Sequence, residues 1–306
     1  MRSRAVAPIL LIVFALGGTA CGSPAPAGTV SDSARASASA HASGASPQPY
    51  LALGDSVAFG YVASATPAPG GGDAYADQAN FAGYPRFAGA ALHLTTFNAA
   101  CPGETSGSML DVHAPDNGCH QYRALFPLHV TYTGTQLQYA DTFLREHHDT
   151  ALVSLGIGAN DGLLVVAQCG GVGNMSCIQQ QLPTVVSTLR GNLTSIIQSL
   201  RATGYRGSIV LVNFYSLSYA DARVTDLVST LDSAIAAVAG AEHLQVADAF
   251  TAFKDAAQPS GDTCAAGLLG PGTSMLGHCD LHPDTAGQQL IATVVARAAR
   301  QGVAQQ

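Results

Sequence analysis

The sequence predicts an α/β protein with a doubly wound, mostly parallel sheet flanked by helices, in a single domain. Short apolar runs of strand length alternate along the chain with longer segments whose apolar residues recur at helical spacing. Such alternation produces right-handed βαβ crossovers and a parallel sheet. The 306 residues are 47% hydrophobic and 11% charged, which fits one folded domain of about 250 residues and a non-globular remainder.

Residues 1–20 have the pattern of an export signal. The basic residues Arg2 and Arg4 precede the apolar run 7–16, and small residues follow that run. The run is too short to span a bilayer comfortably as a permanent helix. We therefore predict that the protein is exported.

Cys21 follows small residues and resembles the lipidated cysteine of the bacterial lipobox, although Gly18 stands where that motif usually has Leu. Ordinary signal-peptidase cleavage near the same place is the alternative. Residues 21–48 are almost wholly Ser, Ala, Gly, Pro and Thr, which predicts a flexible tether. The expected organisation is a signal peptide over 1–20, a tether over 21–48 and a catalytic domain over 49–304, either as a cell-surface lipoprotein or secreted.

The charge of the chain excludes some classes of partner. Its net charge is −7, it has only 13 Lys and Arg residues, and these form no basic run. Nucleic-acid partners and polybasic membrane attachment are therefore not expected. Membrane contact is expected only through a lipid on Cys21, and the protein is expected to be a monomer.

The first half of the domain begins with an apolar run, residues 51–54, that stops abruptly at Asp55 and Ser56. A buried strand has this pattern when its carboxyl end carries polar side chains into a crevice. Residues 66–73 are rich in Pro and Gly and predict a loop. The remaining predicted elements of this half are a helix over 84–94, a strand over 95–98, a glycine-containing turn over 98–106, an irregular segment over 107–137, a helix over 137–146 and a strand over 150–157.

The second half repeats the alternation. Apolar residues at helical spacing mark one face of a long helix from Leu182 to Leu200, and Gly204 is its expected stop. A loop bounded by cysteines precedes Asp280 and His282, and this loop is expected to be irregular. The other predicted elements are strands over 208–213 and 244–247 and helices over 220–239 and 285–299.

Six cysteines remain when Cys21 is set aside. An even number in an exported chain indicates disulfides, although sequence alone cannot choose among the possible pairings. Because the cysteines fall in three sequence-local pairs, we predict Cys101–Cys119, Cys169–Cys177 and Cys264–Cys279. The spacings typical of metal sites are missing, so no metal is expected. The histidines His113, His120 and His129 have no suggestive neighbours and are expected in loops or at the surface.

Four segments place a polar or glycine residue at a strand end or helix entry: Ser56, Gly103, Asn160 and His282. Taken alone, Asp55 and Ser56 fit a turn in which both side chains bond nearby amides. A serine hydroxyl becomes a useful nucleophile only when a base and oxyanion donors join it. The other three positions offer those groups.

Together these segments resemble the signature blocks of the GDSL lipase/esterase family, also called SGNH hydrolases. The blocks are GDSVAFG from Gly54, NAACPGETS from Asn98, GAND from Gly158, and the late His282-Pro283. The resemblance runs from about residue 50 to 299. It implies a flavodoxin-like three-layer sandwich and a cofactor-independent serine hydrolase. It further implies that Ser56 is the nucleophile, that His282 is the general base, and that an oxyanion hole is formed by Ser56, Gly103 and Asn160.

The last block departs from the family pattern. The family usually has Asp-x-x-His, whereas Cys279 stands three residues before His282 and the nearest acid, Asp280, stands two before it. Asp280 is expected to orient the imidazole if the loop turns there. A backbone carbonyl is the alternative, which would leave a Ser–His dyad, and Asp284 is a third candidate.

These residues predict an esterase or lipase that cleaves carboxylic esters of lipids or small acyl groups through an acyl-enzyme on Ser56. A carbohydrate O-acetylesterase on the same fold is an alternative, because fold and catalytic residues do not select the substrate. A catalytically inactive, surface-anchored binding module is the alternative from another class. No cofactor is expected, and the partner is an ester substrate: a lipid, a small acyl ester or an acetylated glycan.

Overall fold

The computed structural model describes residues 46–63, 73–274 and 277–303. The predicted signal peptide, most of the tether including Cys21, the predicted loop 66–73 apart from its last residue, and residue 304 lie outside these ranges.

A five-stranded parallel sheet with the order β2-β1-β3-β4-β5 forms the centre of the fold. Because β1 pairs with β2 on one side and with β3 on the other, the strand order reverses at β1. In sheets of this kind, ligands bind beyond the carboxyl ends of the strands where the order reverses. The strands are β1 (Pro49–Gly54), β2 (Thr95–Asn98), β3 (Leu152–Gly156), β4 (Ser208–Val212) and β5 (Gln245–Ala247).

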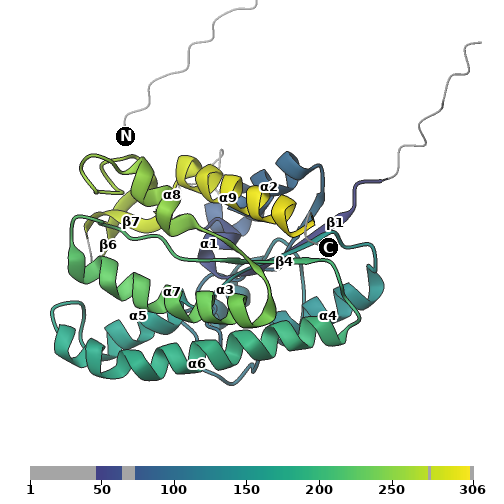
Figure 1. The fold of residues 1–306 in the computed structure, drawn as a ribbon, viewed down its shortest axis with the longest axis horizontal. Helices are drawn as coiled ribbons and strands as arrows, with labels where there is room; N and C mark the ends of the chain where they lie inside the picture. The colour runs from purple at the N-terminus through teal and green to yellow at the C-terminus, as the bar shows by residue number, and fades with distance from the viewer. Residues whose placement is uncertain (1–45, 64–72, 275–276, 304–306) are drawn as a thin grey trace, which may run out of the picture. The chain divides into compact units, whose positions relative to one another are not determined.

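Helices cover both faces of the sheet (Figure 1). Within the described ranges, the α-helices are α1 (Ser56–Phe59), α2 (Tyr84–Leu92), α3 (Cys119–Leu125), α4 (Gln136–Glu146), α5 (Ala159–Gln168), α6 (Met175–Ala202), α7 (Ala222–Glu242), α8 (Ala249–Ala256) and α9 (Thr285–Val303). Two 3₁₀ turns, Ala74–Ala76 and Gln78–Asn80, precede α2.

The residues of β1 alternate between two hydrophobic cores. Tyr50 and Ala52 pack into the layer that contains α2, α8 and α9, whereas Leu51 and Leu53 pack into the layer that contains α4, α6 and α7. This alternation follows from the strand, in which successive side chains point to opposite faces. All residues of β1 are buried, as expected for the central strand of a three-layer sandwich. The predicted fold class is thereby confirmed.

Among the helices of the described ranges, α7 is the one that is long and apolar enough to cross a membrane, by length and composition. Its apolar residues Leu231, Ile235 and Val238 are buried in the domain, where α7 packs beside α6.

The structure corrects several predicted elements. The segment 107–137, expected to be irregular, contains the short helix α3, and two further helices, α5 and α8, begin directly after β3 and β5. These helices are only 7, 10 and 8 residues long, which is too short for helical periodicity to reveal them in the sequence.

The region before His282 is a two-stranded antiparallel hairpin rather than an irregular loop. Strand β6 (Leu269–Ser274) pairs with β7 (Gly277–Pro283), with Leu269 opposite Pro283 and Pro271 opposite Cys279. Gly270, Pro271 and Gly272 obscure the strand in the sequence, because both residue types are depleted in strands. As a consequence, Asp280 and His282 lie on a paired strand.

Candidate active site

Ser56 is the first residue of α1, directly beyond the carboxyl end of β1. Asp55 caps this helix, because its carboxylate accepts a hydrogen bond of 3.0 Å from the backbone N–H of Val57. The side chain of Asp55 is therefore committed to the helix start, and Ser56 projects beside it with 8% of its surface exposed. Burial raises the pKa of Asp55 to about 6.

The imidazole of His282 joins Ser56 to Asp280. Its Nε2 lies 2.9 Å from the Ser56 hydroxyl, and its Nδ1 lies 3.0 Å from each carboxylate oxygen of Asp280. The register of β7 against β6 shifts between Cys279 and Pro283, so the strand bulges there, and Asp280 and His282 come together within this bulge. The structure therefore supplies the contact that the sequence left open.

Asp280 is held from both sides. One carboxylate oxygen also accepts a hydrogen bond of 3.1 Å from the backbone N–H of Ala63. Burial by itself raises the pKa of the Asp280 carboxyl, but the hydrogen bond from His282 and the N–H of Ala63 hold that pKa below its usual range. The third candidate acid, Asp284, instead accepts from the N–H of Gly287 at the start of α9.

Asn160 is buried in the first turn of α5 and makes two hydrogen bonds with its side chain. Its Nδ2 donates to the backbone carbonyl of Glu104 at 2.9 Å, and its Oδ1 accepts from Nδ2 of Asn117 at 2.9 Å. A carboxamide nitrogen carries two hydrogens, so one N–H remains for a further acceptor. The next residue, Asp161, accepts from both the N–H and the hydroxyl of Ser106 and ties this loop to α5.

Gly103 lies in the loop that follows β2. Its φ of +86° is in the left-handed region, and a Cβ at this position would lie 2.4 Å from the carbonyl oxygen of Asn117. Both facts require glycine. The loop reaches β1 through the N–H of Cys101, which donates to the carbonyl of Gly54 at 3.1 Å, and it reaches Asn160 through the carbonyl of Glu104.

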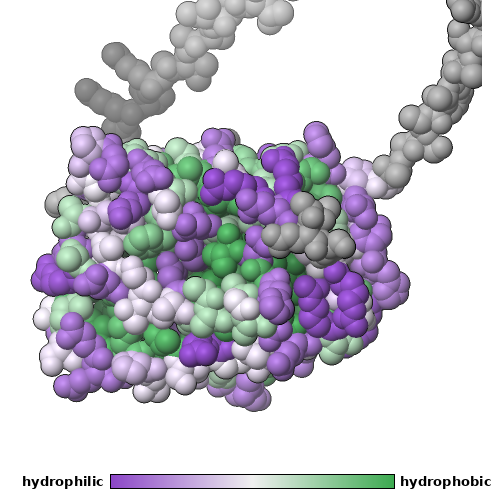
Figure 2. All heavy atoms as spheres, in the orientation of Figure 1, coloured by the Kyte–Doolittle hydropathy of each residue, from purple (hydrophilic) through white to green (hydrophobic). Residues whose placement is uncertain are grey.

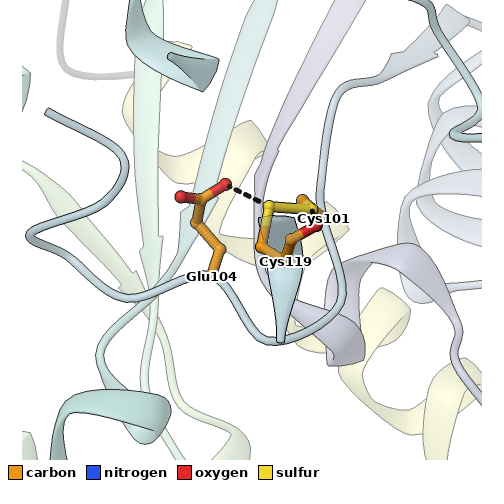
Figure 3. Close-up of side chains that lie close together, drawn as sticks. All are labelled: Cys101, Glu104 and Cys119. Carbon is orange, nitrogen blue, oxygen red and sulfur yellow. Dashed lines mark hydrogen bonds between the residues drawn. A yellow bond between two sulfur atoms is a disulfide. The ribbon is translucent and has the colours of Figure 1, made fainter. Parts of the chain in front are cut away.

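Glu104, the residue after Gly103 in this loop, carries a buried carboxyl group that no sequence pattern indicated. It accepts hydrogen bonds from Ser108 and Gln136, and one of its oxygens lies 3.2 Å from Sγ of Cys119 (Figure 3). Burial raises the pKa of Glu104 to about 7. Because a disulfide sulfur carries no proton, a hydrogen bond across that last contact requires the proton to be on Glu104.

Gln136 connects Glu104 to the strand that carries the serine. Its carboxamide accepts from the N–H of Gly54 at 2.6 Å and donates to the carbonyl of Gly54 at 2.9 Å, while it also donates to Glu104 at 3.3 Å. The contacts of Gln136 with Gly54 join residues 82 positions apart in the chain, so no local pattern could have predicted them.

Cys101, Glu104 and Cys119 form a group of three potential metal ligands that lie close together in the described part of the chain. The two cysteines form a disulfide, as Figure 3 shows. They therefore have no thiolate to offer a metal ion.

The structure forms all three sequence-local disulfides. Cys101–Cys119 lies beside the Gly103 loop, Cys169–Cys177 closes the connection between α5 and α6, and Cys264–Cys279 joins β7 to the segment before β6. Cys279 is adjacent to Asp280, so the last disulfide fixes the strand that carries the acid and the imidazole.

His129 lies in the loop between α3 and α4, as expected, and it is partly buried there. Its ring packs on Phe59 with centroids 4.5 Å apart, its Nε2 lies 2.9 Å from the carbonyl oxygen of Phe59, and burial lowers its pKa. His113 and His120 are exposed, as expected, and His120 contacts Asp116. Tyr61 packs edge-on against the ring of His282, with centroids 4.9 Å apart.

A cavity of about 410 Å³ opens beside Ser56 and Asn160. Its walls are mainly apolar: Leu163 and Val166 come from α5, and Leu227 and Leu231 come from α7. Figure 2 shows apolar surface over α5, between α6 and α7, at the lower left of the view. The Ser56 hydroxyl, in contact with His282, thus lies beside a mainly apolar cavity.

The sequence matches the GDSL-like lipase/acylhydrolase family over residues 52–290. No curated protein matches it significantly. Among solved structures, phospholipase A1 from Streptomyces albidoflavus NA297 is similar with a TM-score of 0.51 and 21% identity, covering 82% of this chain and 99% of that chain. The lipase Lip_vut3 from a goat rumen metagenome is similar with a TM-score of 0.51 and 15% identity, covering 83% of this chain and 98% of that chain. At these identities the two structures share the fold.

Proposed function

The chain belongs to the GDSL-like lipase/acylhydrolase family of carboxylic ester hydrolases, and we propose that it cleaves its ester substrate through an acyl-enzyme on Ser56. The observation that carries the proposal is the chain of contacts from the Ser56 hydroxyl to Nε2 of His282 and from Nδ1 to Asp280. This arrangement supplies a nucleophile, a base and a group that orients the base.

In the proposed reaction, the Ser56 oxygen attacks the ester carbonyl carbon while Nε2 of His282 takes the hydroxyl proton. The carbonyl electron pair moves to oxygen and forms an oxyanion. As the tetrahedral intermediate collapses, the bond to the alcohol oxygen breaks and His282 returns the proton to that oxygen. Water then repeats the sequence on the acyl-enzyme, which releases the carboxylic acid and restores Ser56.

Asp280 has the role of holding the imidazole in the proposed mechanism. A carboxylate at Nδ1 fixes the tautomer that leaves Nε2 free to accept the Ser56 proton, and it stabilises the imidazolium that then forms. The lowered pKa of Asp280 keeps the carboxyl ionised at neutral pH. This supports a triad over the alternative dyad.

Oxyanion stabilisation is assigned to the backbone N–H groups of Ser56 and Gly103 and to the side chain of Asn160. The support is the free N–H that remains on Asn160 after its bond to Glu104, and the shared cavity of Ser56 and Asn160. Preorganised donors of this kind stabilise charge that develops on the carbonyl oxygen.

We propose that the protein is exported and monomeric, and that it binds no nucleic acid. The three disulfides support export, because disulfides persist in oxidising compartments. Lipidation of Cys21 would anchor it to a membrane. A Cys21→Ser variant expressed in a lipoprotein-processing bacterial host tests this: release of the protein from the membrane fraction is expected, whereas unchanged membrane association would contradict lipidation.

The proposed function is tested with oxidised wild-type protein and the variants Ser56→Ala and His282→Ala on p-nitrophenyl esters and acetylated polysaccharide. Hydrolysis by the wild type and a loss of activity in both variants are expected. Comparable activity in Ser56→Ala would contradict the acyl-enzyme. Preferential release of acetate from polysaccharide would favour a carbohydrate O-acetylesterase instead.

A further inference from the structure

The cavity beside Ser56 lies on the acyl side of the proposed reaction. His282 returns its proton to the alcohol oxygen, so the alcohol must leave on the side of the imidazole. The cavity is lined by Ser56 and Asn160, and His282 is not among the described residues that line it. The group that fits this position is therefore the acyl chain of the ester, in the substrate that the proposed function assigns to the site.

Two walls of different construction enclose the cavity. The inner wall is formed at the carboxyl ends of β3 and β4, where Gly156 pairs with Gly54 and Val212 pairs with Ala247. The outer wall comprises α5, the connection from α5 to α6, and the first half of α7. From Asn160 to Val166 the axis of α5 extends about 9 Å. Val172 and Met175 continue the apolar lining beyond that helix.

The outer wall has its own small core. Val165, Val166 and Ile178 cluster with Cys169 apart from the two cores that pack on the sheet. Val172 and Met175 are partly buried against this cluster. Because few other side chains support it, the position of this wall depends on the connection between α5 and α6.

That connection contains little that would fix it without a disulfide. Between Cys169 and Cys177 it has three glycines, and a Cβ placed at any of them would meet nothing within 4 Å. Glycine gives the backbone its greatest freedom. Apart from a few hydrogen bonds, including one from Asn174 to the carbonyl of Cys169, the covalent link between Cys169 and Cys177 is what closes this segment.

We propose that the Cys169–Cys177 disulfide fixes the outer wall of an acyl-chain site and thereby makes the enzyme selective for medium-length acyl esters over acetyl esters. The inference rests on the proposed function of Ser56 and identifies the substrate class of the same site. An acetyl group leaves most of the cavity empty, whereas an octanoyl chain extends along α5 toward Val172 and Met175.

The expected selectivity follows from the burial of methylene groups. Each methylene that leaves water for an apolar wall raises kcat/KM by about fourfold when it is fully covered in the transition state. A wall that is free to move away from the sheet leaves several of these groups partly hydrated. The decrease in kcat/KM that results from a mobile wall therefore grows with the length of the acyl chain and is small for acetate.

The test compares oxidised wild type with the double variant Cys169→Ser/Cys177→Ser on p-nitrophenyl acetate and p-nitrophenyl octanoate. Rates are divided by the concentration of sites labelled at Ser56 by a fluorophosphonate, which corrects for unfolded protein. We expect the ratio of kcat/KM for octanoate to that for acetate to fall at least tenfold in the variant.

A matched control is Leu144→Ala, which removes a buried side chain of α4 in the other core and destabilises the fold by cavity formation. Its ratio should equal that of the wild type. A ratio in the double variant within twofold of the wild type would overturn the proposal, even if the protein were less stable to heat. Wild-type protein that hydrolyses neither ester would overturn the proposed function and this inference with it.

Discussion

At the scale of single residues, Asp280 stands two positions before His282 and contacts its imidazole. A loop with that spacing would not necessarily direct both side chains to one side. Strand β7 brings the two side chains together where its pairing with β6 bulges. The departure from the usual spacing of the family is thus compensated by the secondary structure of this segment.

We predict that Asp280→Asn lowers kcat by about 10³–10⁴-fold while folding is retained, because an amide at Nδ1 favours the wrong tautomer of His282. Steady-state kinetics and circular dichroism would check this. Asp284→Asn is the matched control, since Asp284 caps α9 and its kcat should stay near that of the wild type. A kcat of Asp280→Asn within tenfold of the wild type would favour the dyad.

Glu104 gives a pH-dependent prediction. Its pKa rises from 4.5 to about 7 on folding, so between these pH values the folded state holds a proton that the unfolded state has lost. The contribution of this proton to the free energy of unfolding is fully present below pH 4.5 and is lost as pH rises through about 7. The groups that face Glu104 are Ser108, Gln136, Arg123, Asp116 and the Cys101–Cys119 disulfide.

Glu104→Gln removes this titration. Between pH 4 and pH 8, the free energy of unfolding of the wild type should fall by up to about 3 kcal/mol more than that of the variant. Urea denaturation at both pH values measures the difference, and the other buried acids, such as Asp55 and Asp232, titrate equally in both proteins. A difference between variant and wild type that does not change with pH would contradict a protonated Glu104.

At the scale of elements, the motifs predicted that Ser56, Asn160 and His282 lie at a strand end or a helix start, because short local patterns mark such places. The contacts of Gln136 with Gly54 and of Asn117 with Asn160 had no such signal, since they join segments far apart in the chain. The hairpin β6–β7 was also missed, because its glycines and proline conceal a strand.

The disulfide of the β6–β7 hairpin is expected to act differently from Cys169–Cys177. Cys264–Cys279 anchors β7 next to Asp280. Cys264→Ser/Cys279→Ser should therefore lower kcat/KM for acetate and octanoate esters by the same factor, at least tenfold, because the imidazole and its carboxylate lose their fixed position. Parallel measurements on both esters would check this, and a change in the ratio between them would contradict the assignment.

At the scale of the whole molecule, alternating apolar runs and helices were sufficient to predict a doubly wound, mostly parallel sheet, because burial on both faces forces nearly continuous apolar strands. The three-layer sandwich was implied by the family resemblance. The order of the strands could not be predicted from the sequence, since it depends on the side of β1 to which each crossover connection leads. That order, β2-β1-β3-β4-β5, places Ser56 at the reversal point and beside the cavity.

The central claim is that Ser56 is the nucleophile and that His282 activates it. The most direct measurement is labelling of the oxidised protein with a fluorophosphonate, followed by intact-mass and peptide analysis. We predict one adduct per chain on Ser56, formed together with loss of esterase activity, and a labelling rate that falls by orders of magnitude in His282→Ala. An adduct at another residue, or full esterase activity without modification of Ser56, would contradict the account.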